Sequence, residues 1–179
     1  MSTKIKSVLL TLTVIITVTA VANAKPCDPS KIAGSYIRLG ATGDPVFPQV
    51  MDQLRLGSDG TAYWYSNLAF QLLTTAGTFI PQVGSWQCTD SNTLVVTTIG
   101  AIYERGATDI ELTMHVRFTA KLSIIDNDTL EAGPDSRVFR YFALADDPSD
   151  PNAVPIQGPF SNTNTTSFRR IKPIASDVP

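Results

Sequence analysis

The fold class is decided by residues 110–124, which read IELTMHVRFTAKLSI. Every even-numbered position in this stretch is apolar and every odd-numbered position is polar. This period of two places the two kinds of side chain on opposite faces of a β-strand, whereas a helix would mix them. At about 3.3 Å per residue the stretch would be roughly 50 Å long, beyond the usual strand. We therefore expect one strongly bent strand, with Thr119–Ala120 as the place for a break.

Turn-forming residues divide the rest of the chain into further strands. Asp59-Gly60, for example, separates two short segments, and Asp-Gly is a strong signal for the tip of a β-hairpin. Together the strands predict an all-β fold, an antiparallel up-and-down β-barrel of about eight strands. Residues 67–75 are expected to form a short helix or an irregular cover. The other expected strands are residues 32–39, 53–56, 61–66, 83–89, 93–102, 129–132, 137–144 and 166–172.

The first 24 residues are expected to be a secretory signal peptide. Two lysines precede an apolar run at 8–22, and Ala22-Asn23-Ala24 has small residues at the positions that a signal peptidase reads. The alternative, an uncleaved anchor, is disfavoured because the run is shorter than the ~20 residues that span a bilayer. Cleavage would leave one barrel domain at 25–173 and a tail at 174–179. We expect a secreted or periplasmic protein with no stable membrane insertion after cleavage.

The composition excludes several classes of function. Hydrophobic residues make up 43% of the 179 residues and charged residues only 17%, against roughly 25% in an average soluble domain. A formal net charge of −2 offers no basic stripe, so we expect no nucleic-acid partner. The single histidine, His115, lies on the polar face of the long strand, and common hydrolase and phosphate-loop motifs are missing. We therefore assign no catalytic residue, no cofactor and no metal ligand.

The acidic loop at residues 146–150 leaves two interpretations open. Asp146, Asp147 and Asp150 lie close together in a proline-rich segment, where three carboxylates could gather around Ca²⁺ in a secreted protein. Runs of charge more often simply stay hydrated, and a solvated acidic loop is the alternative that we favour.

The two cysteines are expected to form one structural disulfide. An isolated pair, Cys27 and Cys88, is most often bridged in an oxidising compartment. Neither cysteine has a basic neighbour in the sequence that would lower its thiol pKa and make it reactive. The bridge would attach the start of the mature chain to a central strand.

Short motifs at the two ends of the domain resemble the calycin superfamily. Gly34-Ser35-Tyr36 resembles the Gly-x-Trp opening of the lipocalins, with Tyr36 in place of the tryptophan. Phe168-Arg169-Arg170-Ile171 looks like the last strand of the avidins, which share that superfamily. The resemblance implies that a basic residue of the last strand packs across the first strand's aromatic ring and closes the barrel. Arg169 or Arg170 would take that role on Tyr36.

Aromatic residues indicate what the barrel holds. Tyr63-Trp64-Tyr65 puts bulky rings on both faces of one strand, and residues 137–144 show the same two-sided apolar character. An eight-stranded barrel is just wide enough to be filled by side chains or to hold one small ligand. We expect a small apolar or amphipathic ligand, with a filled core as the alternative. The expected binding residues are Tyr63, Tyr65, Met114, Phe118, Phe142 and, as a polar anchor, Arg140.

Non-enzymatic ligand binding is thus the favoured function, and two other classes stay open. The protein could instead bind a protein partner, for example as a protease inhibitor. The start of the mature chain, Lys25-Pro26-Cys27, would then insert into the protease. A cofactor-free isomerase or cyclase would need a buried ionisable pair inside the barrel, and a buried, unpaired Arg140 would point to it.

Overall fold

The computed structural model describes residues 27–41, 49–66, 78–79, 81–105, 109–161 and 163–172. The expected signal peptide, the C-terminal tail at 174–179 and the helix at 67–75 lie outside these residues. In the described part, one short helix, α1 (Pro29–Ile32), precedes eleven strands that belong to one antiparallel sheet. The strands are β1 (Gly34–Ala41), β2 (Gln49–Leu56), β3 (Thr61–Ser66), β4 (Thr78–Phe79), β5 (Gln82–Cys88), β6 (Thr93–Arg105), β7 (Ile110–Asp126), β8 (Thr129–Ala132), β9 (Arg137–Phe142), β10 (Gln157–Ser161) and β11 (Thr166–Arg170).

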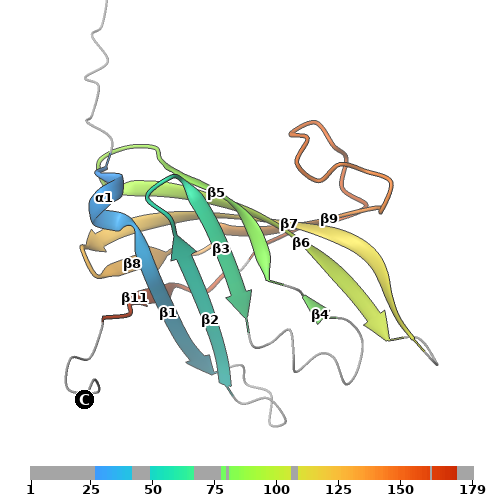
Figure 1. Cartoon of the computed structure of the whole chain (residues 1–179), viewed down its shortest axis with the longest axis horizontal. Helices are drawn as coiled ribbons and strands as arrows, with labels where there is room; N and C mark the ends of the chain where they lie inside the picture. Colours follow the sequence, from blue (N-terminus) through green and yellow to red (C-terminus); the bar gives the residue numbers. More distant parts are fainter. Residues whose placement is uncertain are drawn as a thin grey trace, which may run out of the picture.

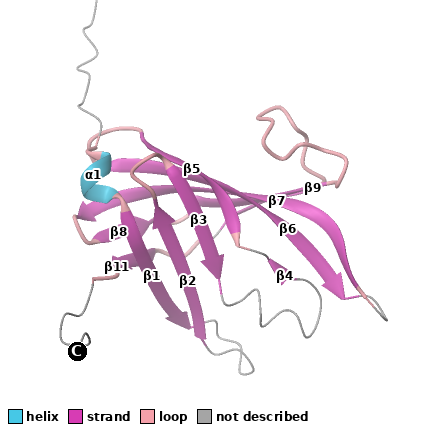
Figure 2. Cartoon of the chain, in the orientation of Figure 1, coloured by secondary structure: helices cyan, strands magenta, loops and turns pink. Residues whose placement is uncertain are grey.

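Eight of the strands close into a ring (Figure 1). Their order is β1-β2-β3-β5-β6-β7-β8-β11, and β11 pairs with β1 again. Strand β4 adds to the free edge of β6, while β9 and β10 add to β7. Strands and their connecting turns make up nearly all of the described chain (Figure 2). The predicted all-β, eight-stranded antiparallel barrel is confirmed, and it is compatible with a calycin-like fold.

The long strand β7 is where the ring branches. One edge of β7 pairs with β6 over the whole length of β6. The other edge of β7 pairs with β9 first and, further along the strand, with β8. A strand has only two edges, so two successive partners on one edge require a long strand. The break expected at Thr119–Ala120 was wrong, since both residues pair with β6 and β9 without interruption.

An irregularity does occur in β7, but nearer its start. Ile102 pairs with Met114 and Tyr103 pairs with Leu112, so Thr113 is an extra residue in the ladder. Its hydroxyl donates to the Ile102 carbonyl at 3.2 Å. A bulge of this kind shifts the alternation by one residue. Leu112 is therefore 36% exposed, although it continues the apolar pattern of the sequence.

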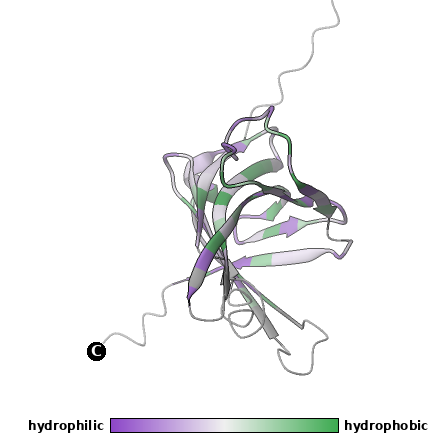
Figure 3. Cartoon of the chain, turned by 90° about the vertical axis from the view of Figure 1, so that its right-hand side faces the viewer, coloured by the Kyte–Doolittle hydropathy of each residue, from purple (hydrophilic) through white to green (hydrophobic). Residues whose placement is uncertain are grey.

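Side chains from every wall fill much of the barrel interior. Hydrophobic and hydrophilic residues alternate along the strands, as period two requires (Figure 3). Trp64 forms the centre of the packing: its ring centroid lies 4.5 Å from that of Phe118 and 5.4 Å from that of Phe168. Burying such a side chain stabilises the fold by about 1.5–3 kcal/mol. The side chains with no exposed surface include Leu54, Leu94, Val96, Phe118, Leu122, Leu130 and Phe168.

In the part of the chain that the structure describes, no helix has the length and apolar character needed to cross a membrane.

Candidate functional site

One end of the barrel is closed by Arg170 packed on Tyr36. The Arg170 guanidinium carbon lies 5.1 Å from the centroid of the Tyr36 ring, and its Nη2 donates to the Tyr36 hydroxyl at 2.7 Å. Arg170 also donates to the carbonyls of Ala33, at 2.9 Å, and Ile32, at 3.2 Å, at the end of α1. Gly34 leaves space for the Arg170 guanidinium, because a Cβ at this position would lie only 3.0 Å from Arg170 Nη1. Arg169 points the other way and is exposed.

Tyr36 itself is only 1% exposed and ties the first strand to α1. Its hydroxyl donates to the Ile32 carbonyl at 2.6 Å. Burial raises the pKa of this phenol, although the positive charge of Arg170 acts in the opposite direction. A neutral, hydrogen-bonded phenol under a guanidinium is a structural closure rather than a reactive group.

The predicted disulfide between Cys27 and Cys88 is confirmed. It joins Cys27, two residues before α1, to the end of β5 across 61 residues of sequence, with the two Cα atoms 5.5 Å apart. The Cys27 backbone N–H also donates to the Asp90 carbonyl at 3.0 Å. The described chain start is therefore fastened to the same end of the barrel that Arg170 closes.

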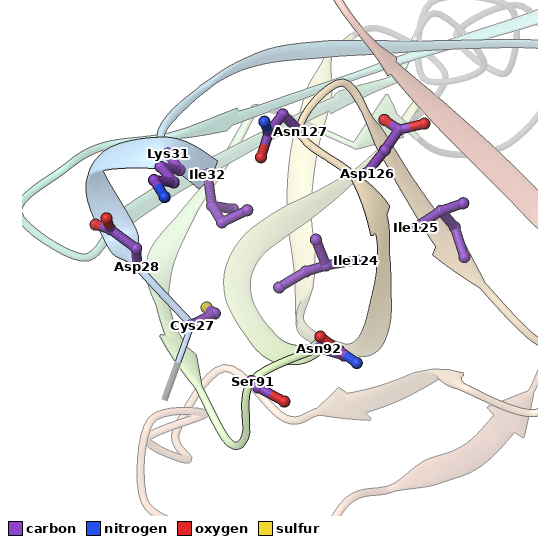
Figure 4. A pocket seen from close by; sticks show the side chains of 10 residues that line it. All are labelled: Cys27, Asp28, Lys31, Ile32, Ser91, Asn92, Ile124, Ile125, Asp126 and Asn127. Carbon is purple, nitrogen blue, oxygen red and sulfur yellow. The ribbon is translucent and has the colours of Figure 1, made fainter. Parts of the chain in front are cut away.

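A pocket of about 500 Å³ lies beside the disulfide, between α1 and two turns (Figure 4). Most of its polar side chains are exposed, and some make hydrogen bonds within the turn to which they belong. Asp126 is an example: its carboxylate accepts the Asp128 backbone N–H at 2.7 Å, and this hydrogen bond lowers the Asp126 pKa. The pocket is lined by Cys27, Asp28, Lys31, Ile32, Ser91, Asn92, Ile124, Ile125, Asp126 and Asn127.

The barrel interior holds a more distinctive arrangement, an ion pair of Arg38 and Asp52. Arg38 shares the inner face of β1 with Tyr36, and Asp52 shares that of β2 with Leu54. Arg38 Nη1 lies 2.6 Å from Asp52 Oδ2, with the two side chains 21% and 6% exposed. A buried carboxylate needs such a partner, because an unpaired charge is costly away from water.

Arg137, at the start of β9, is the most deeply buried charge that the structure describes. It is 3% exposed and pairs across the ladder with Ala120, on the inner face of β7. Burial lowers the pKa of its guanidinium, the charge of Arg38 lowers it further, and the Asp52 carboxylate raises it. All three side chains lie on the inner face of the sheet. We call Arg38, Asp52 and Arg137 the interior charged cluster, and it is the candidate functional site.

One buried nitrogen of the Arg137 guanidinium, Nε, has no hydrogen-bond partner. Nη2 donates to the Asn164 carbonyl at 2.9 Å, whereas Nε is buried without any hydrogen-bond partner. Native proteins satisfy the great majority of buried polar atoms, so an exception of this kind needs an explanation.

A polar pair of side chains, Gln82 and Thr98, interrupts the apolar wall on β5 and β6. The Thr98 hydroxyl donates to the Gln82 side-chain oxygen at 2.7 Å.

The structure places two of the six expected ligand residues on the inner face. Phe118 is fully buried and packs against Trp64 and Phe139, and Met114 is half-buried on the same face of β7. Tyr63 and Tyr65 do not line the interior, which corrects their assignment. Trp64 points inward, so its two neighbours point outward, and Tyr63 is 43% exposed.

Phe142 and Arg140 also face outward, contrary to the expectation that they line the interior. In the β7–β9 ladder Phe142 pairs with His115 and Arg140 with Arg117, all on the opposite face from Phe118. Phe142 is nevertheless buried, because the Arg117 guanidinium lies 4.7 Å from its ring centroid. Arg117 Nη1 donates to the carbonyls of Pro148 and Asp150, at 3.2 and 2.9 Å, and so holds the proline-rich loop over this face.

The acidic loop uses its carboxylates within the loop itself. Asp147 accepts the Ser149 N–H at 2.8 Å, and Asp150 accepts the Asn152 N–H at 2.8 Å. Among the described residues, no group of three or more His, Cys, Asp or Glu side chains comes together to hold a metal ion.

The interior charged cluster was missed at the level of the sequence. Its signal was present in two places, since Arg38 and Asp52 fall in phase with the buried Tyr36 and Leu54. Arg137 gave no such signal, because the face of β9 that turns inward depends on its register with β7.

Comparisons with family models, with curated proteins and with solved structures find no match to this chain. Its class is therefore defined by the fold and the site alone: an all-β barrel with a buried charged cluster inside.

Proposed function

We propose that this protein is an exported, lipocalin-like binding protein that holds a small amphipathic ligand in its barrel without a reaction of its own. One observation carries the proposal: the inner surface combines an apolar wall with the interior charged cluster. An amphipathic molecule matches both parts, because its apolar portion replaces water on the wall while its polar group meets the charges. The disulfide and the expected signal peptide support export.

The test is the displacement of a neutral dye, N-phenyl-1-naphthylamine, by 1-decanol and by decanoate. We expect the dye to bind with a stoichiometry of one and to be displaced by at least one of the two. Met114→Trp should weaken binding about tenfold, because the larger ring occupies space on the inner face of β7. Leu112→Trp is the matched control, since the bulge turns that residue outward. Absence of a displaceable site, with native mass spectrometry showing no bound molecule, would refute the proposal.

A second candidate, a cofactor-free isomerase or cyclase, is favoured by the Arg38–Asp52 pair. Such an enzyme needs an ionisable pair shielded from water, and this pair is mostly buried. The test is to identify a bound molecule by mass spectrometry and to incubate it with the wild type and with Asp52→Asn. Conversion by the wild type alone would favour the enzyme over the carrier.

The third candidate, a protein-interaction module such as a protease inhibitor, depends on the chain start. Lys25 and Pro26 lie outside the described residues, and Cys27 is held in the disulfide. Loss of inhibition on trimming Lys25 and Pro26 would be its signature.

A further inference from the structure

The two arginines of the interior charged cluster differ in the partners that they contact. Arg38 has a carboxylate partner at 2.6 Å, whereas Arg137 contacts a neutral carbonyl, that of Asn164. Of the two, Arg137 is the more deeply buried. Among the described residues, the cluster thus holds two guanidinium groups and one carboxylate.

This imbalance leaves one positive charge inside the barrel without a counter-ion among the described residues. Transferring an ion from water to the interior costs several kcal/mol unless a partner of opposite charge compensates. The Asp52 carboxylate is already shared with Arg38, and it cannot neutralise both guanidinium groups. A group of negative charge supplied from outside the described chain would balance the cluster.

The chemistry and the position of the Arg137 guanidinium suit the binding of a carboxylate. A guanidinium has five N–H donors in a planar fork that matches the two oxygens of a carboxylate. The Nε–H of Arg137 is buried and makes no hydrogen bond, so a donor of this fork is left unsatisfied. Charge-assisted hydrogen bonds of this type are about twice as strong as neutral ones.

We infer that the ligand carries a carboxylate, and that this group binds Arg137 inside the barrel, with its apolar part beside the half-buried Met114 on the inner face of β7. The inference rests on the proposed binding function and adds to it the chemical class of the ligand: a small amphipathic carboxylic acid. Arg137 is the residue that sets the preference for the anion, and the Arg38–Asp52 pair keeps Asp52 from competing for it.

The experiment compares decanoate with 1-decanol, which has the same chain length without the charge. Each is titrated at neutral pH against N-phenyl-1-naphthylamine in mixtures with wild-type protein, Arg137→Met, Arg137→Lys and Arg140→Met. Arg140→Met is the matched control, because Arg140 is on the same strand but on its outer face. Circular dichroism and thermal unfolding check that each variant is folded.

We expect wild-type protein and Arg140→Met to bind decanoate at least about tenfold more tightly than decanol. Arg137→Met should abolish that preference while decanol binding stays within about twofold, and Arg137→Lys should restore part of it. If Arg137→Met does not fold, the wild-type preference and its reduction in Arg137→Lys decide the matter.

The failures of the two proposals are distinguishable. Equal affinity of the wild type for decanoate and decanol would overturn the carboxylate inference while the binding function stands. A preference that survives in Arg137→Met would likewise overturn it. If neither molecule displaces the dye and no dye binds, the proposed binding function itself fails.

Discussion

Arg170 and Arg137 have the same side chain in the same barrel, yet their surroundings differ in kind. Arg170 donates to carbonyls at the end of α1 and to the Tyr36 hydroxyl, and its plane covers the Tyr36 ring. Arg137 lies deeper and donates to one carbonyl, that of Asn164. The Nε atoms of both arginines lack a hydrogen-bond partner, but that of Arg170 lies 3.7 Å from the Asp128 carboxylate, whereas Arg137 has no carboxylate in ion-pair contact among the described residues.

Asp52 is the residue whose loss should cost the most stability in the interior charged cluster. Asp52→Ala would remove the one carboxylate of the cluster and leave Arg38 without its ion-pair partner. Removing one member of a buried ion pair typically costs about 3–5 kcal/mol, and we expect about 3 here because Arg38 retains some contact with solvent. Urea unfolding followed by circular dichroism would measure the change.

The control for Asp52 is its neighbour Gln53, which is exposed on the outer face of β2. Gln53→Ala should change the unfolding free energy by less than about 0.5 kcal/mol. If Asp52→Ala were as mild as Gln53→Ala, the buried charges would not depend on Asp52.

At the scale of elements, the strand phase was harder to predict than the strands. The Asp59-Gly60 turn appears where expected: Gly60 has φ of 85°, which glycine adopts readily, and Thr61 donates to the Asp59 carboxylate at 3.0 Å. The aromatic triplet beside it does not reveal its own phase, because all three residues are apolar rings. Packing of Trp64 against Phe118 and Phe168 decides which of them points inward.

Gly84 tests how tightly β5 and β6 are packed together. A Cβ at Gly84 would lie 1.9 Å from the Thr97 carbonyl oxygen, and backbone cannot move aside as a flexible side chain can. Gly84→Ala should therefore force the two strands apart and destabilise the protein by about 3 kcal/mol, at the upper end for overpacking. Thermal and urea unfolding would measure the loss.

Gly133 is the matched control for Gly84. A Cβ at that position would meet no atom within 4 Å, so Gly133→Ala should be close to neutral. A Gly84→Ala variant that is as stable as Gly133→Ala would show that the close approach of the two strands is not required.

At the scale of the whole molecule, two long-range contacts hold the region around α1 to the barrel. The disulfide joins Cys27 to β5, and Arg170 brings the last strand onto α1 and Tyr36. Both contacts lie at the closed end, while the interior charged cluster lies on β1, β2 and β9. The closed end is thus held independently of the candidate binding site.

Removal of the disulfide should therefore lower stability without changing ligand binding. For a loop of 61 residues, the chain-entropy model predicts a loss of about 4 kcal/mol in the double variant Cys27→Ser/Cys88→Ser. Urea unfolding measures this loss, and dye binding at low temperature checks the site. An unchanged urea midpoint, or loss of dye binding while the variant is still folded, would contradict this prediction.

The sequence by itself determined the class of fold, the cysteine pair and all of the strands except β4 and β10. Period two along residues 110–124 and the turn chemistry between strands are local properties, and each is written in neighbouring residues. The inward phase of Arg38 and Asp52 could be read in the same way, because each alternates with a buried apolar residue.

Only the tertiary structure decided which residues share the interior. The inner face of β9 is set by its register with β7, and so Arg137 lies inside while Arg140 and Phe142 lie outside. The bulge at Thr113 likewise turns Leu112 outward against its local pattern. Register and bulges depend on partner strands that are remote in the sequence, and a shift of one residue exchanges the two faces of a strand.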